Sequence, residues 1–433
     1  MAGPVETSPL DSVPWRAPES ATIDAAAVQR RTLRLLFVTQ IISGVGVTVG
    51  SSVGALLTAE LAGTRVSGFA QSAAVVGAAL LALPAAWLVH RRGRRWSLAA
   101  AYAIAALGAI VVAAAAASGA IGPLFLGFFL FGGATAAGMQ ARYAAVDLSP
   151  AALRGRHLSI VVWATTLGAV AGPQLAAVAG AALEGYGVPT LAGPFVVSAL
   201  LFSLAAALLV LRMRPDPALV AREVGPPPPP GTSSQERGGM RSALRAVASH
   251  PSARLGVAAM AVGHLVMVGV MAMTPVHIRS AGYDAAHTLR IVGVVLSLHI
   301  AGMYAFSPVV GWLTDRAGRR AVIVAGIVLL LAACALAGTA GHDTARLAVG
   351  LMVLGLGWSS TMVSGSTLLS ESIPVELRAS AQGLSDATMG LAGASAGALS
   401  GVVVDAWGFR VLALIAALAA LPLILPAARR SRR

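Results

Sequence analysis

The chain has 433 residues, of which 57% are hydrophobic and 11% are charged, and its mean hydropathy is +0.80. Soluble globular proteins carry roughly 25% charged residues, so this composition excludes an ordinary water-soluble protein and favours a membrane protein. The net charge of +14 comes from arginine alone, and the arginines are scattered between apolar segments, which argues against nucleic-acid binding. The single cysteine, Cys334, excludes an intramolecular disulfide and the cysteine-based metal sites.

Residues 1–32 are polar and carry charges of both signs, without the order of a signal peptide, which predicts a loose tail. Apolar segments then recur along the chain, each long enough to cross a bilayer as a helix. In the first half they lie at 33–61, 67–89, 97–118, 121–143, 157–183 and 191–212.

A polar stretch at 213–252 interrupts this pattern and contains a run of prolines from Pro226 to Pro230, which predicts a partly disordered linker. Six more apolar segments follow, at 254–278, 288–313, 321–341, 345–370, 379–405 and 409–427, before a basic tail at 429–433. We therefore predict an all-α membrane protein of twelve transmembrane helices, with one six-helix half at 33–212 and another at 253–428.

The distribution of arginine predicts the orientation. An even number of spans puts both termini on one side of the membrane. If that side is the cytoplasm, 26 of the 31 arginines lie inside. The outer loops then hold only Arg65, Arg279, Arg290, Arg346 and Arg410. Cytoplasmic loops are enriched in arginine and lysine, so we expect both termini in the cytoplasm and the chain in the cytoplasmic membrane of a bacterium.

The two halves repeat each other in sequence. AWLVHRRGRR at 86–95 corresponds to GWLTDRAGRR at 311–320 with an offset of 225, and DLSPAALR at 147–154 corresponds to ESIPVELR at 371–378 with an offset of 224. Each copy lies between the same two spans of its half. This pattern predicts two parallel repeats that descend from one six-helix unit.

The loop at 311–320 carries a family resemblance. Its signature residues are Gly311, Asp315, Arg316, Gly318, Arg319 and Arg320. Together with the repeated six-helix pattern over about 33–428, they resemble the G-x-L-x-D-R-x-G-R-R loop of the major facilitator superfamily. The resemblance implies transport by alternating access, in which two halves rock about a central site. The Asp315 carboxylate would then form contacts with guanidinium groups and a helix N-terminus that break when the cytoplasmic side opens. A plain positive-inside anchor is the alternative interpretation.

The first copy of this loop keeps Gly93 and Arg94 but has His90 where the second copy has Asp315. A neutral imidazole cannot replace a carboxylate, and a protonated one would repel the nearby arginines. Because histidine changes charge near physiological pH, we predict a weakened or pH-dependent gating contact in the first half. Simple loss of the motif, with the second copy sufficient, is the alternative.

The fifth span contains Gly168, Gly172 and Pro173, which resemble the G-x-x-x-G-P signature associated with antiporters of this superfamily. Small residues allow close helix approach and proline bends a span, so packing is the alternative interpretation. In the eleventh span, Asp386 is a costly charge and a candidate proton carrier, unless it pairs with Arg378 near the interface.

Spans seven and eight are rich in methionine and histidine. The seventh has Met260, His264, Met267 and Met271 along one helix face, and the eighth has His299 and Met303 one turn apart. Thioether and imidazole groups suit Cu(I), and the pattern resembles the bacterial copper importers of the superfamily.

That resemblance implies a transporter with a Met/His copper site. Proton-coupled efflux of drug-like or other organic compounds is the alternative, with the same face serving as an adaptable apolar wall. A non-transporting sensor on the same fold is a third reading. We find no enzymatic constellation and expect no cofactor. The expected partners are a small solute or metal ion and the lipid bilayer, with the chain acting as a monomer.

Overall fold

The computed structural model describes residues 24–150, 153–224, 240–374 and 377–428. Within these ranges the chain is helical and contains no strand. Most of the predicted N-terminal tail, the proline run of the linker and the basic C-terminal tail lie outside the described residues.

The helices form two successive groups, which we call the N-half and the C-half. The N-half comprises α1 (Ala25–Ala62), α2 (Thr64–Ser67), α3 (Phe69–Ser118), α4 (Ile121–Phe131), α5 (Gly133–Ala144), α6 (Arg154–Glu184) and α7 (Gly193–Arg212). The C-half comprises α10 (Pro251–Arg279), α11 (Ala285–Tyr304), α12 (Ser307–Ala317), α13 (Arg319–Gly338), α14 (Thr344–Ser372), α15 (Arg378–Ala420), a 3-10 turn (Leu421–Leu423) and α16 (Ile424–Ala428).

The described residues contain ten helical segments that are long and apolar enough to cross a membrane. Two of these, Thr64–Ser118 and Ser380–Ala428, have 55 and 49 residues, which is enough for two crossings each. Each is interrupted by a glycine with positive φ, Gly93 at +84° and Gly408 at +80°. If each of these two long segments is counted as two spans, one on either side of its glycine, the ten segments give the twelve predicted spans.

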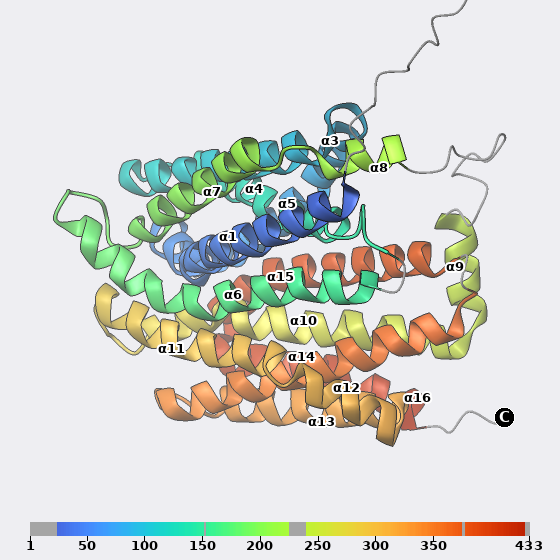
Figure 1. Ribbon diagram of the computed structural model, residues 1–433. Helices are drawn as coiled ribbons and strands as arrows, with labels where there is room; N and C mark the ends of the chain where they lie inside the picture. Colours follow the sequence, from blue (N-terminus) through green and yellow to red (C-terminus); the bar gives the residue numbers. More distant parts are fainter. Residues whose placement is uncertain (1–23, 151–152, 225–239, 375–376, 429–433) are drawn as a thin grey trace, which may run out of the picture.

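The spans run roughly parallel or antiparallel to one another, with the N-half uppermost and the C-half below it in Figure 1. The halves meet where α6 packs on α11 and where α15 packs on α2 and α3. We call the end that holds the start of α1 and α10 and the end of α7 the linker end, and the opposite end the far end. The last described helix, α16, also lies at the linker end.

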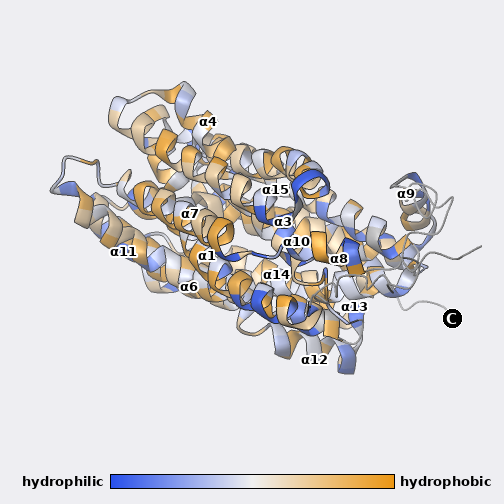
Figure 2. Cartoon of the chain, turned by 45° about the horizontal axis from the view of Figure 1, so that its top comes forward, coloured by the Kyte–Doolittle hydropathy of each residue, from blue (hydrophilic) through white to orange (hydrophobic). Residues whose placement is uncertain are grey.

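The predicted linker contains two short helices, α8 (Pro217–Val224) and α9 (Met240–Ser249). Helix α9 lies across the ends of the spans in Figure 1 and buries Ala243 and Val247 against the C-half. The composition of 213–252 did not reveal these helices because each is short and only one face of α9 is apolar. Hydrophobic residues cover the helices along most of their length, as Figure 2 shows.

Candidate functional site

Each charged loop holds an arginine that is paired within its own half. In the N-half, Arg94 donates from Nε and Nη2 to the Asp147 carboxylate at 2.8 and 3.1 Å, and from Nη1 to Gln140 at 2.8 Å. In the C-half, Arg319 donates to the Glu371 carboxylate at 2.7 and 3.0 Å. The offsets between these two pairs are those of the sequence repeat, so both halves retain the same ion pair.

A carboxylate that the sequence interpretation missed holds the corner at Gly93. Asp216 follows α7 and is 8% exposed. It accepts hydrogen bonds from the backbone N–H groups of Arg94 at 3.1 Å and Arg95 at 2.7 Å, and of Ala218 at 2.9 Å. A Cβ at Gly93 would meet the Asp216 carboxylate, so glycine provides both the positive φ and the space. Asp216 therefore caps the helix that begins after the break.

His90 lies on the other side of the same break, with an exposed side chain. Its carbonyl oxygen and that of Val89 accept hydrogen bonds from Arg222 of α8, at 2.9 and 3.1 Å. These are carbonyls at the C-terminus of a helix, where a cation is favourable. Arg222 of α8 thus places a positive charge at the C-terminus of the helix before Gly93. Asp216, in the turn before α8, places a negative charge at the N-terminus of the helix after Gly93. The pH-dependent contact of His90 stays a prediction.

The other gating residues of the C-half make local contacts. The Asp315 side chain is 76% exposed and lies 3.3 Å from Arg319 Nη2. The Arg316 guanidinium lies 5.4 Å from the centre of the Trp312 ring. Arg320 donates to the carbonyl oxygen of Pro426 at 2.9 Å. Gly318 has a φ of +92° and forms the turn between α12 and α13. All of these contacts lie within the C-half.

The small residues of the fifth span let α6 approach α1. A Cβ at Gly168 would meet the carbonyl oxygen of Ile41, and one at Gly172 would meet the Thr48 hydroxyl. Pro173 lies inside α6, and its carbonyl oxygen would be 2.8 Å from a Cβ at Gly293 of α11. The residues of the G-x-x-x-G-P motif therefore lie in two helix contacts, that of α6 with α1 within the N-half and that of α6 with α11 between the halves.

The halves are held together in the far part of the molecule. Ser72 of α3 donates to the carbonyl oxygen of Ala394 on α15 at 2.6 Å, and Ser297 of α11 donates to that of Val170 on α6 at 2.8 Å. A Cβ at Gly68 would meet the carbonyl oxygen of Gly397. The far end is therefore tightly closed.

An ion pair completes this closure. Arg279 of α10 lies 3.5 Å from Glu60 of α1, so it joins the halves at the far end. Glu60 lies in the last turn of α1, and nothing in the sequence indicates its partner in the other half.

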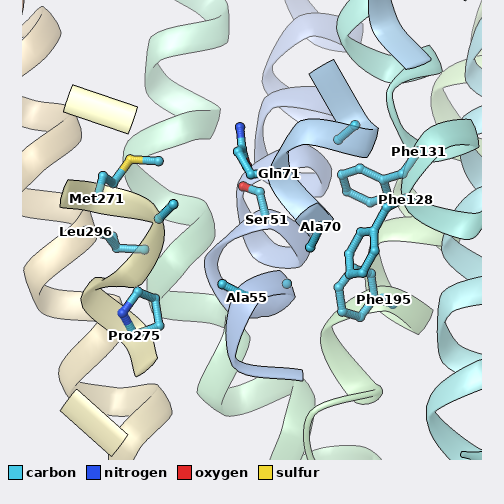
Figure 3. A pocket seen from close by; sticks show the side chains of 13 residues that line it. Ser51, Ala55, Ala70, Gln71, Phe128, Phe131, Phe195, Met271, Pro275 and Leu296 are labelled. Atoms are coloured by element: carbon cyan, nitrogen blue, oxygen red, sulfur yellow. The ribbon is translucent and has the colours of Figure 1, made fainter. Parts of the chain in front are cut away.

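A pocket lies between the halves on the far side of the molecular centre. Met271 and Leu296 of the C-half lie on one side of it and Phe128 and Phe195 of the N-half on the other, with Gln71 between them (Figure 3). The cavity has a volume of about 40 Å³, which holds a few water molecules at most. It is a constricted part of the space between the halves.

The predicted Met/His residues contact several different neighbours. Met271 lines the pocket, and Met267 is 4% exposed in the core of the C-half. Met260 accepts a weak hydrogen bond from Ser385 of α15, at 3.7 Å from its sulfur. Among the described residues, no three His, Cys, Asp or Glu side chains come together as a metal-binding group.

His299 and Met303 share a face of α11 that packs on α14. His299 is fully buried, and its Nδ1 lies 2.7 Å from the carbonyl oxygen of Leu351, to which it donates. Its Nε2 is buried and has no partner among the described residues. Met303 is 8% exposed, and a Cβ at Gly355 would lie 2.9 Å from its backbone nitrogen.

His264 belongs to an aromatic cluster that connects three helices. The Trp358 indole N–H of α14 donates to His264 Nδ1 at 3.1 Å, and the Tyr304 ring of α11 meets the Trp358 ring edge to face at 5.9 Å. Indole is only a donor, so Nδ1 is unprotonated and Nε2 carries the proton of the neutral ring. Nε2 lies next to Gly393, where a Cβ would be 2.8 Å away, and has no hydrogen-bond partner among the described residues. The sequence interpretation did not single out Trp358 or Tyr304.

The candidate proton carrier Asp386 does not pair with Arg378 in the structure. Asp386 of α15 is exposed and forms no ion pair with a described residue, and Arg378 donates instead to the carbonyl oxygen of Ile373. Arg142 of α5, in the N-half, is likewise exposed and forms no hydrogen bond or ion pair with a described residue.

Comparison with known proteins gives the family. The model of the Major Facilitator Superfamily matches residues 35–289 and again 285–432. The chain belongs to the Major Facilitator Superfamily. It is therefore a secondary transporter and not an enzyme, and the family resemblance seen in its charged loops is confirmed.

Several relatives of this Major Facilitator Superfamily transporter are known. It is 38% identical over 403 residues to the uncharacterized MFS-type transporter YdeG of Bacillus subtilis, covering 92% of this chain and 91% of the relative. It is 27% identical over 364 residues to the riboflavin transporter RfnT of Brucella anthropi, covering 81% and 84%. The nucleoside transporter NupG has the same fold, with a TM-score of 0.71 at 18% identity over 93% of this chain and all of that one. The finer resemblance to copper importers finds no support among these proteins.

Proposed function

We propose that this transporter moves a small organic solute with a planar aromatic ring across the cytoplasmic membrane. The observation that carries the proposal is the aromatic cluster of His264, Tyr304 and Trp358, which three helices of the C-half bring together. Ligand sites combine an apolar aromatic wall with a few oriented polar groups, and this cluster has both.

The aromatic cluster offers a ring two kinds of recognition. The Trp358 indole and the Tyr304 phenol provide faces and edges for stacking, which contributes about 0.5–1.5 kcal/mol beyond the burial of apolar area. The Trp358 N–H holds His264 in one tautomer, so that Nε2 is a fixed donor for a ring carbonyl or ring nitrogen. The riboflavin transporter RfnT suggests riboflavin, a planar heterocycle with such acceptors, as the first probe.

The arginine distribution supports an orientation for this transport. With both termini in the cytoplasm, the linker end is cytoplasmic, and the far-end contacts close the outer side of the pathway. The two halves, 33–212 and 253–428, would then rock about the aromatic cluster. Asp386, whose side chain is exposed, serves as the candidate proton carrier, whether the solute is taken up or exported.

A ligand-binding assay tests this proposal, because it does not require the direction of transport to be known. Purified protein in nanodiscs is titrated with riboflavin, with hypoxanthine and with the non-aromatic solute xylose, and the unfolding temperature is recorded, because a bound ligand stabilises the native state. We expect an aromatic probe to raise it, and Trp358→Ala to abolish the effect while Trp407→Ala, at a 64% exposed site, does not. Stabilisation by no aromatic probe, or by xylose equally, would contradict the proposal.

Copper uptake through a Met/His site is the second candidate, and one observation favours it. His299 donates from Nδ1 to a backbone carbonyl and keeps the lone pair of Nε2 buried and unpartnered, which is the arrangement of many metal-binding histidines. Copper-starved cells that produce the native protein should then accumulate more copper than cells with Met271→Leu/His299→Ala at equal membrane abundance. Equal copper contents by elemental mass spectrometry would exclude this candidate.

A further inference from the structure

Each charged loop also contains a tryptophan stacked by an arginine. The Arg91 guanidinium lies 4.3 Å from the centre of the Trp87 ring in the N-half, and the Arg316 guanidinium lies 5.4 Å from that of Trp312 in the C-half. The two pairs are related by the offset of the sequence repeat, and their rings are 54% and 56% exposed. Neither arginine forms a hydrogen bond or ion pair with a described residue. Cation–π attraction thus holds each guanidinium over a ring and leaves its N–H groups free for another acceptor.

An exposed apolar stripe leads to the pair of the N-half. It consists of Val76, Leu80, Leu83 and Trp87 of α3, which are 44 to 69% exposed. Their spacing of four, three and four residues places them along one helix face, and Arg91 follows one turn later. At a rise of about 1.5 Å per residue the stripe is about 16 Å long, close to half of the roughly 30 Å hydrocarbon core of a bilayer. It therefore matches the acyl chains of one leaflet.

The charges beside the two pairs differ. In the C-half, Arg316 directly follows Asp315, whose side chain is 76% exposed. In the N-half, His90 takes the place of this carboxylate, and Arg92 follows Arg91, with all three side chains exposed. Arg92 likewise forms no hydrogen bond or ion pair with a described residue. The exposed loop of the N-half therefore presents cations without an adjacent anion.

The carboxylates around the corner at Gly93 are engaged or balanced. Asp147 is bound to Arg94 and its side chain is 16% exposed, and Asp216 is 8% exposed and accepts from backbone N–H groups. In α8 the exposed Glu223 stands next to Arg222, so this helix adds no net charge. The positive charge of the loop is left for a ligand from outside the chain.

We propose that the corner at Gly93 binds an anionic phospholipid, with its phosphate at Arg91 and Arg92 and an acyl chain along the apolar stripe. Guanidinium groups bind phosphate oxygens bidentately, and the indole of Trp87 belongs at the level of the headgroups. The carboxylate of Asp315 repels such a headgroup at the matching pair of the C-half. Replacement of that carboxylate by His90 thus makes the N-half site selective for negative lipids, whichever solute is transported.

Quenching of tryptophan fluorescence by brominated lipids tests the site. The protein is placed in nanodiscs of phosphatidylcholine and phosphatidylglycerol at one fixed ratio, with bromine on the acyl chains of one lipid or of the other. Bromine quenches the tryptophans that its chain touches, so a selective site shows excess quenching by brominated phosphatidylglycerol. We expect this excess, and we expect Trp87→Phe to remove most of it while the matched control Trp312→Phe leaves it intact. Equal quenching by the two lipids, or an excess that survives Trp87→Phe, would overturn the proposal.

The charge variants test why the two corners differ. Arg91→Gln should lower the apparent affinity for phosphatidylglycerol about fivefold, the contribution of one arginine near an anionic surface. His90→Asp should lower it at least as much, and Asp315→His should create a new excess that Trp312→Phe removes. Each variant is accepted only if it elutes as the native protein does in size-exclusion chromatography. An unchanged excess in both Arg91→Gln and His90→Asp would show that the charges of the loop do not select the lipid.

A soluble phosphate distinguishes a lipid from a free anion. Glycerol 3-phosphate has the same phosphate group without acyl chains, so at millimolar concentration it should leave the excess quenching unchanged. Loss of the excess would identify the corner as a site for free anions and overturn the lipid as its ligand. None of these measurements uses a transported solute, so a failure of riboflavin to bind leaves their outcomes unaffected.

Discussion

At the scale of the residue, the corner at Gly93 depends on a carboxylate from a distant part of the chain. Asp216 satisfies backbone N–H groups of both the helix that begins at Arg94 and its own turn. Such N–H groups have no partner within their helix, and leaving them buried without an acceptor is costly. The corner of the N-half is thus held by Asp216, and His90 contributes to it through its carbonyl oxygen, which accepts from Arg222.

We expect Asp216→Ala to destabilise the protein by about 2–3 kcal/mol, because several buried donors lose their acceptor at once. Asp284, the exposed N-cap of α11, accepts only from the N–H of His287 at 2.7 Å. Its replacement by alanine should cost about 1 kcal/mol or less. Thermal unfolding in detergent compares the two, and equal losses would show that Asp216 is an ordinary cap.

The repeated ion pairs should differ in strength because their burial differs. Arg94 and Asp147 have side chains 12% and 16% exposed, whereas Arg319 and Glu371 are 28% and 50% exposed. We expect Asp147→Asn to cost about 2–4 kcal/mol and Glu371→Gln about 1 kcal/mol or less. The same unfolding assay measures both, and a larger loss for Glu371→Gln would refute this ranking.

The sequence predicted the loop arginines Arg94 and Arg319 from their motif, but not the carboxylates they bind. The repeat aligns Asp147 with Glu371, but it does not show that each of these carboxylates binds the loop arginine of its own half. Asp216 was beyond such reasoning, because it lies in a segment with no counterpart in the C-half and is brought to Gly93 only by the tertiary fold.

At the scale of the element, the spans follow from hydrophobicity and their contacts follow from small residues. The packing of α6 on α1 brings backbone against backbone at Gly44 and Gly168. A Cβ added to Gly44 would lie only 3.3 Å from the Cα of Gly168. In a bilayer, helix association depends on such close packing rather than on the exclusion of water. The predicted spans agree with the helices to within a few residues at most ends.

Gly168→Ala tests this contact. The added Cβ would meet the carbonyl oxygen of Ile41 and lie 2.8 Å from the backbone nitrogen of Val45, so we expect a loss of about 1–3 kcal/mol. Gly383→Ala in α15 is the matched control, because a Cβ there meets nothing within 4 Å. The control should be neutral or stabilise by up to about 1 kcal/mol. Equal unfolding temperatures for the two variants would show that α1 and α6 are loosely packed.

The elements that the sequence did not predict share a physical cause. Helices α8 and α9 have 8 and 10 residues and obtain their stability from contacts with the bundle, such as that of Arg222 with the carbonyl oxygen of His90, just before the break in α3. Isolated helices of this length are marginal, so local composition carries little signal for them. The breaks at Ala305 and Gly132 inside single spans were likewise invisible to hydropathy.

At the scale of the whole molecule, the structure is asymmetric along the membrane normal. The far end is closed by hydrogen bonds, by the Arg279–Glu60 ion pair and by the approach of Gly68 to Gly397, while Arg142 and Asp386 near the linker end are exposed and form no ion pair with a described residue. The sequence predicted two halves from the repeat, and it placed Asp386 among the candidate residues. It could not reveal the aromatic cluster, because Trp358, Tyr304 and His264 come from three helices whose relative rotation is set by packing.

We expect the two halves to open one end of the molecule by closing the other about the site between them. Distances between spin labels in nanodiscs measure this directly, with one pair at the far end (Tyr186→Cys/Asp405→Cys) and one at the linker end (Arg92→Cys/Arg316→Cys). Gly397→Leu supplies the perturbation, because a side chain there would meet Ser72 at 3.0 Å and Gly68 at 3.4 Å in the closed far end. We expect this substitution to lengthen the far-end distance and to shorten the linker-end distance. A far end that opens while the linker-end distance stays fixed would contradict it.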